Sequence, residues 1–274
     1  MIFDSHTHIH FPAYDSDRKE VIERAKKVGV KMILVGTQAA SSEAGVALAK
    51  QYPGEMWATA GFHPNHFASS WYHDKNEQAE AEREEFDAKK LRVIAANPEV
   101  VAIGEFGLDY YRLTDGKKEK EDQQEAFEVQ IEIAKDLNKA LMMHCRPSKG
   151  ADDAYLDAAH ILGTYDSLPA KIFHFYVGSI AATKKLAEMG AYFTFGGVVT
   201  FSRDYDEVVK YLPVDRILLE TDAPYVAPEL YRGKRNEPAF IIETAKKMAE
   251  LKGVSLEALS NQIVKNNKVV FSLN

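Results

Sequence analysis

The chain has 274 residues, of which 46% are hydrophobic and 27% charged, so it can bury a sizeable core and is not intrinsically disordered. Its 34 basic and 41 acidic side chains give a net charge of -7, which excludes indiscriminate binding along a polyanion and restricts any nucleic-acid contact to a local surface. A single cysteine, Cys145, excludes an internal disulfide framework and is typical of a reducing compartment.

The opening segment MIFDSHTH has no basic region followed by a long apolar run. No stretch of the chain approaches the roughly 20 apolar residues of a membrane-spanning helix. Together with the lone cysteine, these features predict a cytoplasmic protein that makes no membrane contact. We expect it to act as a monomer.

Short apolar runs rich in strand-forming residues recur along the chain. Eight of them occupy residues 1–6, 31–36, 56–62, 100–106, 140–145, 171–176, 192–197 and 216–221. Helix-like segments lie between them, and in the segment 125–139 the side chains of Phe127, Ile131 and Ala134 share one face. Alternating strands and helices predict a parallel sheet.

The strand starts are far enough apart for crossover helices, since a βαβ unit takes roughly 30 residues. The number of strands favours a closed (β/α)8 TIM barrel over an open doubly wound sheet, and such a barrel commonly takes about 250 residues as one domain. We therefore expect residues 1–274 to form a single α/β domain of this kind, with the amphipathic region 255–271 completing the outer ring. The charged run 76–90 lies in the longest gap and is predicted to be the solvated face of a helix.

Metal-capable side chains follow the ends of five predicted strands. They are His6, His8, Glu105, His144, His174 and Asp222. Barrel enzymes build their sites from the C-terminal ends of their strands, and side chains two apart in a strand share a face. Each residue alone has a structural alternative, because a lone histidine is often a hydrogen-bonded core residue and an aspartate often caps a helix. It is improbable that all six residues have purely structural roles at once.

Four histidines and two carboxylates are enough to hold two divalent ions about 3.5 to 4 Å apart, provided that one carboxylate bridges them. Such a pair lowers the pKa of a bound water towards roughly 7 and stabilises charge that develops on substrate oxygens. The predicted reaction type is therefore hydrolysis. Imidazole ligands favour zinc or manganese.

A series of strings carries a resemblance to a known family. They are HTH, GEFGLDYYR, QEAFEVQ, HCR, HFYVGS, ETDAPY and RGKRNEP, in this order from residue 6 to residue 238. Together they resemble the TatD family of metal-dependent deoxyribonucleases, within the amidohydrolase superfamily. The resemblance implies a TIM barrel with a two-metal site, magnesium as the usual activator, and a nucleic-acid substrate whose phosphodiester bonds are cleaved. The family typically removes nucleotides from a 3′ end of single-stranded DNA or RNA.

The resemblance also implies roles for the metal ligands. His6 and His8 would hold one ion together with Asp222. The second ion would be held by His144 and His174, with Glu105 as the bridge. We expect Asp222 to orient or deprotonate the attacking water as well, because it would touch both the metal and the nucleophile.

Residues around the metals are expected to bind the substrate. His63, in GFHPN, matches a family histidine that faces the substrate phosphate, although a structural histidine beside Pro64 is an alternative. Glu220 would orient a metal ligand, or form a salt bridge inside the barrel. His66 and Cys145 are assigned structural roles. The cations near the predicted site, which could contact phosphate, are Arg112, Arg146, Arg232, Lys234 and Arg235.

Aromatic side chains near the same strings could stack on an exposed base, and we expect one or two of them to do so. They are Phe62, Phe67, Trp71, Tyr72, Tyr110, Tyr111 and Tyr225. The chain departs from the family pattern in HFYVGS at 174–179 and in Pro147 and Ser148 after HCR. None of these positions is a predicted metal ligand. They lie where the substrate would be recognised, so they affect the choice of substrate rather than the reaction.

Two other functions compete with a nuclease. One is a superfamily hydrolase of a small phosphoester, lactone or amide. Many superfamily members bridge their ions with a modified lysine, whereas Glu105 occupies the fourth strand here. The other is a metal-binding scaffold without turnover, against which the complete set of costly buried ligands argues.

Overall fold

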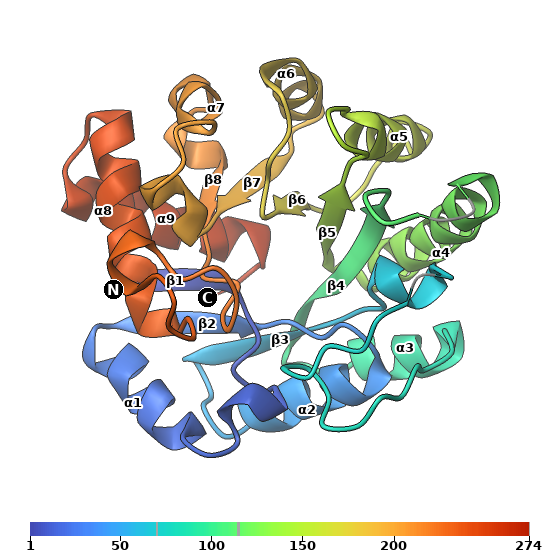
Figure 1. The fold of residues 1–274 in the computed structure, drawn as a ribbon, viewed down its shortest axis with the longest axis horizontal. Helices are drawn as coiled ribbons and strands as arrows, with labels where there is room; N and C mark the ends of the chain where they lie inside the picture. Colours follow the sequence, from blue (N-terminus) through green and yellow to red (C-terminus); the bar gives the residue numbers. More distant parts are fainter. Residues whose placement is uncertain (70, 114–115, 274) are drawn as a thin grey trace.

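Parallel strands form the centre of the computed structural model, which describes residues 1–69, 71–113 and 116–273 (Figure 1). Each strand pairs with the next one along the chain, from β1 to β8. The strands are β1 (Ile2–Thr7), β2 (Val30–Leu34), β3 (Met56–Ala60), β4 (Val100–Asp109), β5 (Ala140–Arg146), β6 (Lys171–His174), β7 (Tyr192–Phe195) and β8 (Ile217–Leu219). The eight predicted strands are therefore present, with β4 longer and β3 and β6 to β8 shorter than expected.

Helices surround the strands on the outside, as Figure 1 shows. They are α1 (Arg18–Lys27), α2 (Ala39–Ala49), α3 (Ala88–Ala95), α4 (Gly116–Leu137), α5 (Asp153–Leu162), α6 (Ile180–Glu188), α7 (Asp206–Tyr211), α8 (Ile241–Lys252) and α9 (Leu256–Val270). Helix α9 packs against β1 and β8, so the C-terminal region completes the outer ring as predicted. The fold is a (β/α)8 TIM barrel, which confirms the predicted class.

The barrel closes where the chain beyond β8 runs beside β1. The backbone N–H of Asp222 donates to the carbonyl of His6 at 2.9 Å, and the N–H of His8 donates to the carbonyl of Ala223 at 2.8 Å. Backbone hydrogen bonds thus place the predicted ligand from the eighth strand directly beside the two from the first.

Side chains of each strand alternate between two apolar layers. Ile33, Met142 and Leu218 belong to a cluster inside the barrel, whereas Leu34 and Met143 pack in the larger cluster between strands and helices. Cys145 also belongs to the outer cluster. Its neighbour His144 therefore faces the barrel interior, as the sequence predicted from strand alternation.

Register shifts set which residues of β1 and β4 point inward. Two residues of β1 lie between Asp4 and Thr7, whereas one residue of β2 lies between their partners Met32 and Leu34, so β1 contains one extra residue. In β4 the same shift lies between Ile103 and Phe106. Phe106 pairs with Met143 of the outer layer, so the bulge turns the preceding Glu105 towards the interior. Regular alternation from Ile103 would have sent that carboxylate outward.

The charged run 76–90 is not the helix that the sequence predicted. Helix α3 begins only at Ala88, where the Asp87 side chain accepts hydrogen bonds from the first turn. Upstream of Asp87, two acidic side chains bond to other parts of the chain instead: Glu77 accepts from the hydroxyl of Thr37 and Glu84 from the N–H of Ala40 in the first turn of α2. Other acidic side chains of the run, such as Glu80 and Glu82, are exposed to solvent as predicted, but on a loop rather than on a helix.

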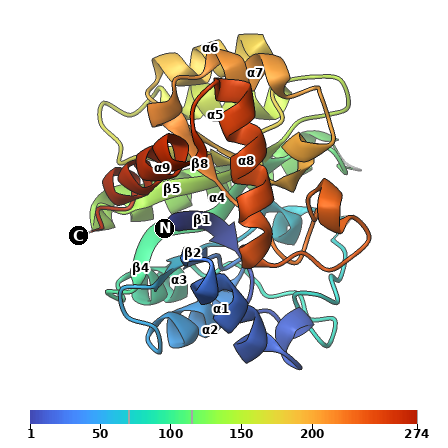
Figure 2. The ribbon, with the colours of Figure 1, turned by 90° about the vertical axis from the view of Figure 1, so that its left-hand side faces the viewer.

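The loops that follow the strands gather on one side of the barrel. Figure 2 shows the long connections 61–87 and 220–237 on the side opposite to both chain ends. Among the described residues, no helix combines the length and the apolar character needed to cross a membrane.

Candidate metal centre

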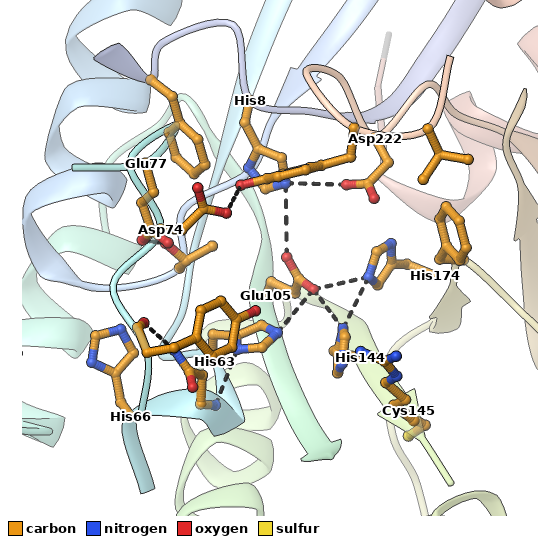
Figure 3. Close-up of a pocket in the computed structure, with 18 of the residues that line it drawn as sticks. His8, His63, His66, Asp74, Glu77, Glu105, His144, Cys145, His174 and Asp222 are labelled. Carbon is orange, nitrogen blue, oxygen red and sulfur yellow. Dashed lines mark hydrogen bonds and ion pairs between the residues drawn. The ribbon is translucent and has the colours of Figure 1, made fainter. Parts of the chain in front are cut away.

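A cavity of about 490 Å³ opens among these loops, at the C-terminal ends of the strands. Five of the six predicted metal ligands line it, together with His63; the sixth, His6, is completely buried beside them. Figure 3 shows Glu105 at the centre of this group, with interactions to residues from several strands. The barrel thus brings together side chains that lie up to 216 positions apart, because the ends of its strands meet at one rim.

The first cluster of donor atoms comes from β1 and from the segment after β8. The Nε2 atoms of His6 and His8 lie 3.1 Å apart. Asp222 Oδ1 is 3.7 Å from the first of these nitrogens and 3.3 Å from the second. Glu105 Oε2 approaches His6 Nε2 to 3.3 Å. Two imidazoles and two carboxylates therefore surround one point.

The second cluster surrounds the other oxygen of Glu105. Its Oε1 atom lies 2.8 Å from His144 Nδ1 and 2.9 Å from His174 Nε2. His63 Nε2 is also close, at 3.5 Å from the same oxygen. The two oxygens of one carboxylate therefore belong to two different donor clusters, which is the arrangement that a bridging ligand needs.

Acceptor oxygens behind the rings indicate which imidazole nitrogen faces the clusters, through a hydrogen bond at His8 and an ion-pair contact at His174. His8 Nδ1 lies 2.8 Å from the carbonyl oxygen of Val35, so this nitrogen carries the proton and Nε2 offers its lone pair. His174 Nδ1 lies 3.4 Å from Glu220 Oε2, which leaves His174 Nε2 free for the cluster. The structure thus places Glu220 where the sequence proposed it, behind a predicted ligand.

Asp109 lies behind His144 in the same way, and this position was not predicted from the sequence. Asp109 Oδ2 lies 3.4 Å from His144 Nε2, so the other nitrogen, Nδ1, faces Glu105. The residue stands in the string GEFGLD, but the predicted strand ended at residue 106. The signal was a second carboxylate four positions after Glu105, which the longer β4 brings to the same rim.

The protonation of the buried groups reflects this crowding of charges. Burial lowers the pKa of His6 to about 3, and His174 contributes to the shift, so His6 is neutral. Burial also lowers the pKa of His174, but the carboxylates of Glu105 and Glu220 outweigh burial and raise this pKa well above its usual value. Burial raises the pKa of Glu105, yet His174, His63 and His6 hold it well below its usual range.

This donor set fits divalent cations. Groups of three ligand atoms lie within 4.8 Å of one another in His6, His8 and Asp222, and again in His63, Glu105 and His144. The rings of His8, His144 and His174 direct nitrogen lone pairs towards buried carboxylates. Because lone pairs and carboxylates repel one another, this arrangement is stabilised by a cation bound between them. In the absence of a cation, a proton on His174 supplies part of that charge.

His63 is oriented to donate a hydrogen bond into the cavity. Its Nδ1 accepts from the backbone N–H of Asn65 at 3.1 Å, so the proton of the neutral ring is on Nε2. Burial lowers the pKa of His63 to about 3, and the nearby His144 adds to this effect. A neutral donor is therefore directed at Glu105 Oε1 in the second cluster.

A buried aspartate supports the segment that carries Asp222. Asp4 Oδ1 accepts from the N–H of Thr221 at 2.9 Å, and Asp4 Oδ2 accepts from the Thr221 hydroxyl at 2.5 Å. The backbone immediately before Asp222 is thereby attached to β1. Sequence reasoning did not single out Asp4, although it stands two residues before His6 in the same strand.

The five predicted phosphate-binding cations are not equally placed. Arg146 lines the cavity, whereas Arg232, Lys234 and Arg235 do not. Arg235 pairs with Asp17 at 2.6 Å. The Arg232 guanidinium lies 4.4 Å from the ring centre of Phe201, and Lys234 lies near Tyr231. A substrate would have to extend beyond the cavity to reach these three residues.

The remaining wall carries polar groups that the sequence did not connect with the site. Asp74 and Glu77 line the cavity, and the Tyr225 hydroxyl donates to Asp74 Oδ2 at 2.6 Å. Burial raises the pKa of Glu77 to about 7. His66, expected to be structural, also borders the cavity and makes an edge contact with Phe62.

Comparison with known proteins agrees with this geometry. A model of the TatD related DNase family matches residues 3–272. YabD from Bacillus subtilis, an uncharacterized metal-dependent hydrolase, is 34% identical over 278 residues, covering 100% of both chains. The 3′-5′ ssDNA/RNA exonuclease TatD from Pantoea vagans is 34% identical over 281 residues, covering 99% of this chain and 100% of its own.

Among solved structures, the fold is similar to that of YjjV, a TatD homolog from Escherichia coli K12. The TM-score is 0.81 at 25% identity, and the match covers 100% of this chain and 98% of that one. A whole-chain family match, relatives of equal length and a rim of buried histidines and carboxylates lead to the same conclusion. The chain belongs to the TatD-related DNase family and is a metal-dependent hydrolase that acts on ester bonds.

Proposed function

We propose that this enzyme removes nucleotides from the 3′ end of single-stranded DNA or RNA by phosphodiester hydrolysis. The observation that carries the proposal is the position of Glu105, whose two oxygens belong to two separate clusters of imidazole and carboxylate donors. This arrangement suits two cations that act on one phosphate group. The name of the Pantoea vagans relative, an exonuclease of single-stranded DNA and RNA, supports this choice of substrate.

The ligands would divide between two ions in this proposal. His6, His8 and Asp222 would hold one ion, and His144 and His174 would hold the other, with Glu105 between them. Bound divalent ions would supply Lewis acidity, lowering the pKa of a water towards roughly 7 and stabilising negative charge on the phosphoryl oxygens.

The side chains of the chain itself would handle the protons. Asp222 Oδ1 faces the first cluster, and the residue lines the cavity, which supports its role as the group that would accept the proton of the attacking water. The Nε2–H of neutral His63 would donate to a phosphoryl oxygen or to the leaving alkoxide. Arg146 adds a fixed positive charge at the cavity wall for the phosphate.

The test starts from protein stripped with a chelator and reloaded with magnesium, manganese or zinc in turn. A 5′-labelled single-stranded oligonucleotide should shorten from its 3′ end only in the presence of metal. The variants His6→Ala and Glu105→Ala should lose this activity, because each removes a donor from the centre. His160→Ala, on the exposed side of α5, is the matched control and should retain it.

A second substrate shows whether the enzyme hydrolyses phosphodiesters in general or only nucleic acids. Bis(p-nitrophenyl) phosphate is a small phosphodiester that needs only the metal centre. Hydrolysis of this ester without any cleavage of oligonucleotides would overturn the nuclease proposal and favour a small-ester substrate. Asp222→Asn tests the proton acceptor: near-normal turnover in a variant that still binds its metal would show that another group takes the proton.

A further inference from the structure

Two half-exposed tyrosines stand beside the metal centre, each covered by a guanidinium group. The Arg146 guanidinium lies 4.0 Å from the ring centre of Tyr111, and the Arg112 guanidinium lies 4.4 Å from that of Tyr72. The rings remain 49% and 44% exposed, respectively. Tyr72 and Arg146 line the cavity itself. Large aromatic surface is thus left open to solvent at the rim of the site.

Both members of the Tyr111 pair are held in fixed positions relative to the metal ligands. Arg146 stands two residues after His144 in β5, so both side chains face the same side of the strand. Asp109 Oδ1 accepts from the N–H of Tyr111 at 3.0 Å, while its other oxygen contacts His144. One carboxylate therefore connects the tyrosine backbone to a predicted ligand.

Acidic and basic side chains lie on opposite walls of the cavity, and their charges would orient a bound nucleic-acid strand. Figure 3 shows Asp74 and Glu77 across the cavity from His144 and Cys145. Arg146 directly follows Cys145 in β5, so its guanidinium comes from the wall opposite these two carboxylates. Phosphates near β5 would be attracted to Arg146, and Arg112, which lies over Tyr72 near Asp74, would offset the repulsion from that carboxylate.

We propose that Tyr111 with Arg146, and Tyr72 with Arg112, form a stacking platform for the nucleotides that precede the scissile phosphate. Each exposed ring would stack on a base, and each guanidinium would contact a backbone phosphate. A base in a duplex is already stacked and paired, so the platform would select unpaired 3′ ends. This inference rests on the proposed nuclease function and names the residues that give it its preference for single strands.

The test is steady-state kinetics of the metal-loaded enzyme with Tyr111→Leu, Tyr72→Leu and the double variant. Loss of one stacked base should raise KM for a single-stranded oligonucleotide roughly 5- to 100-fold. The rise in KM for the oligonucleotide should exceed any rise in KM for bis(p-nitrophenyl) phosphate by the same factor. The ratio of the rates on a single strand and on a blunt duplex should fall as well, which a general structural defect would not cause.

Tyr211→Leu is the matched control. Tyr211 is 45% exposed and lies beneath Lys184, at 5.7 Å, on the outer helices. Its substitution should change neither KM nor the preference for single strands. If the enzyme degrades oligonucleotides and the rim variants behave like Tyr211→Leu, the platform is overturned while the nuclease function stands. If the wild-type enzyme hydrolyses only the small diester, the nuclease function fails and the platform fails with it.

Discussion

Acceptor oxygens behind the imidazoles determine which ring nitrogens face the candidate metal centre. Each of three imidazoles has an acceptor behind the ring. The acceptor is the backbone carbonyl of Val35 for His8, the carboxylate of Asp109 for His144 and the carboxylate of Glu220 for His174. An acceptor in this position fixes the tautomer and turns the other nitrogen towards the metal. The supporting residues would therefore matter almost as much as the predicted ligands, although they would touch no cation.

Asp109→Asn tests this at the scale of one residue. The amide keeps the shape of the side chain but loses the charge that faces His144 Nε2, so we expect metal affinity to fall by about 10- to 100-fold. Isothermal titration of the stripped protein with manganese would measure the change. Asp215→Asn, which alters an exposed carboxylate before β8, is the control. Equal affinities of the two variants would show that Asp109 does not orient the ligand.

At the scale of secondary-structure elements, the site depends on irregular strands and on the connections between helices. The bulge in β4 turns Glu105 inward, and Gly107 lets β4 approach β5 so closely that a Cβ atom at this position would overlap the backbone of His144. Helix α5, which follows the strand that carries His144, begins at Asp153. Its first residue accepts from the N–H of Ser148 at 2.8 Å and pairs with Lys120 of α4 at 2.9 Å.

The pH dependence of stability tests this connection. Burial raises the pKa of Asp153, but the hydrogen bonds from Lys120 and Ser148 outweigh burial and lower it. Since the folded-state pKa lies below the unfolded value of about 3.9, the stabilisation is present above that value and is lost as pH falls through the folded-state pKa. Asp153→Asn should therefore lower the free energy of unfolding near pH 7 by up to about 1 kcal/mol, and by less near pH 3.

Urea denaturation at both pH values measures the difference, with Asp215→Asn as the control. The same loss at neutral and acidic pH would mean that the ionisation of Asp153 contributes nothing. In that case the hydrogen bond from Ser148, rather than the ion pair, would be the stabilising contact.

On the scale of the whole molecule, the metal centre joins the two ends of the barrel wall. His6 and His8 come from β1, Asp222 follows β8, and Glu105 reaches both clusters from β4. Without a cation, buried carboxylates and imidazoles face one another with incomplete compensation of charge. A bound ion would connect the first and last strands through one group of ligands and so stabilise the closed barrel.

Removal of metal should therefore lower the melting temperature. An ion at 100 times its Kd stabilises the folded state by about 2.7 kcal/mol, which corresponds to a shift of roughly 5 to 10 °C for a chain of this size. Thermal unfolding with and without a chelator, followed by circular dichroism, would measure it. The double variant His6→Ala/Glu105→Ala should show no such shift. An unchanged melting temperature of the wild-type protein would contradict the expected coupling between metal binding and folding.

Much of the fold and of the centre could be predicted from the sequence because both depend on local patterns. Alternation of apolar runs and helical segments specified the barrel, since each strand must bury both of its faces. Residues at the ends of strands could then be assigned to one rim, and Glu105 and His174 line one cavity at the C-terminal ends of the strands. The family followed from strings distributed over the whole chain.

Only the tertiary structure decided the features that depend on contacts between distant segments. Asp109 lies behind His144 because β4 continues beyond residue 106, where the predicted strand ended. Residues 76–87 form no helix, and two of their carboxylates, Glu77 and Glu84, accept hydrogen bonds from Thr37 and from Ala40 of α2. The structure also separated Arg146, which lines the cavity, from Arg235, which pairs with Asp17. Local pattern determines which residues can reach a rim, whereas packing between loops determines which of them face the same space.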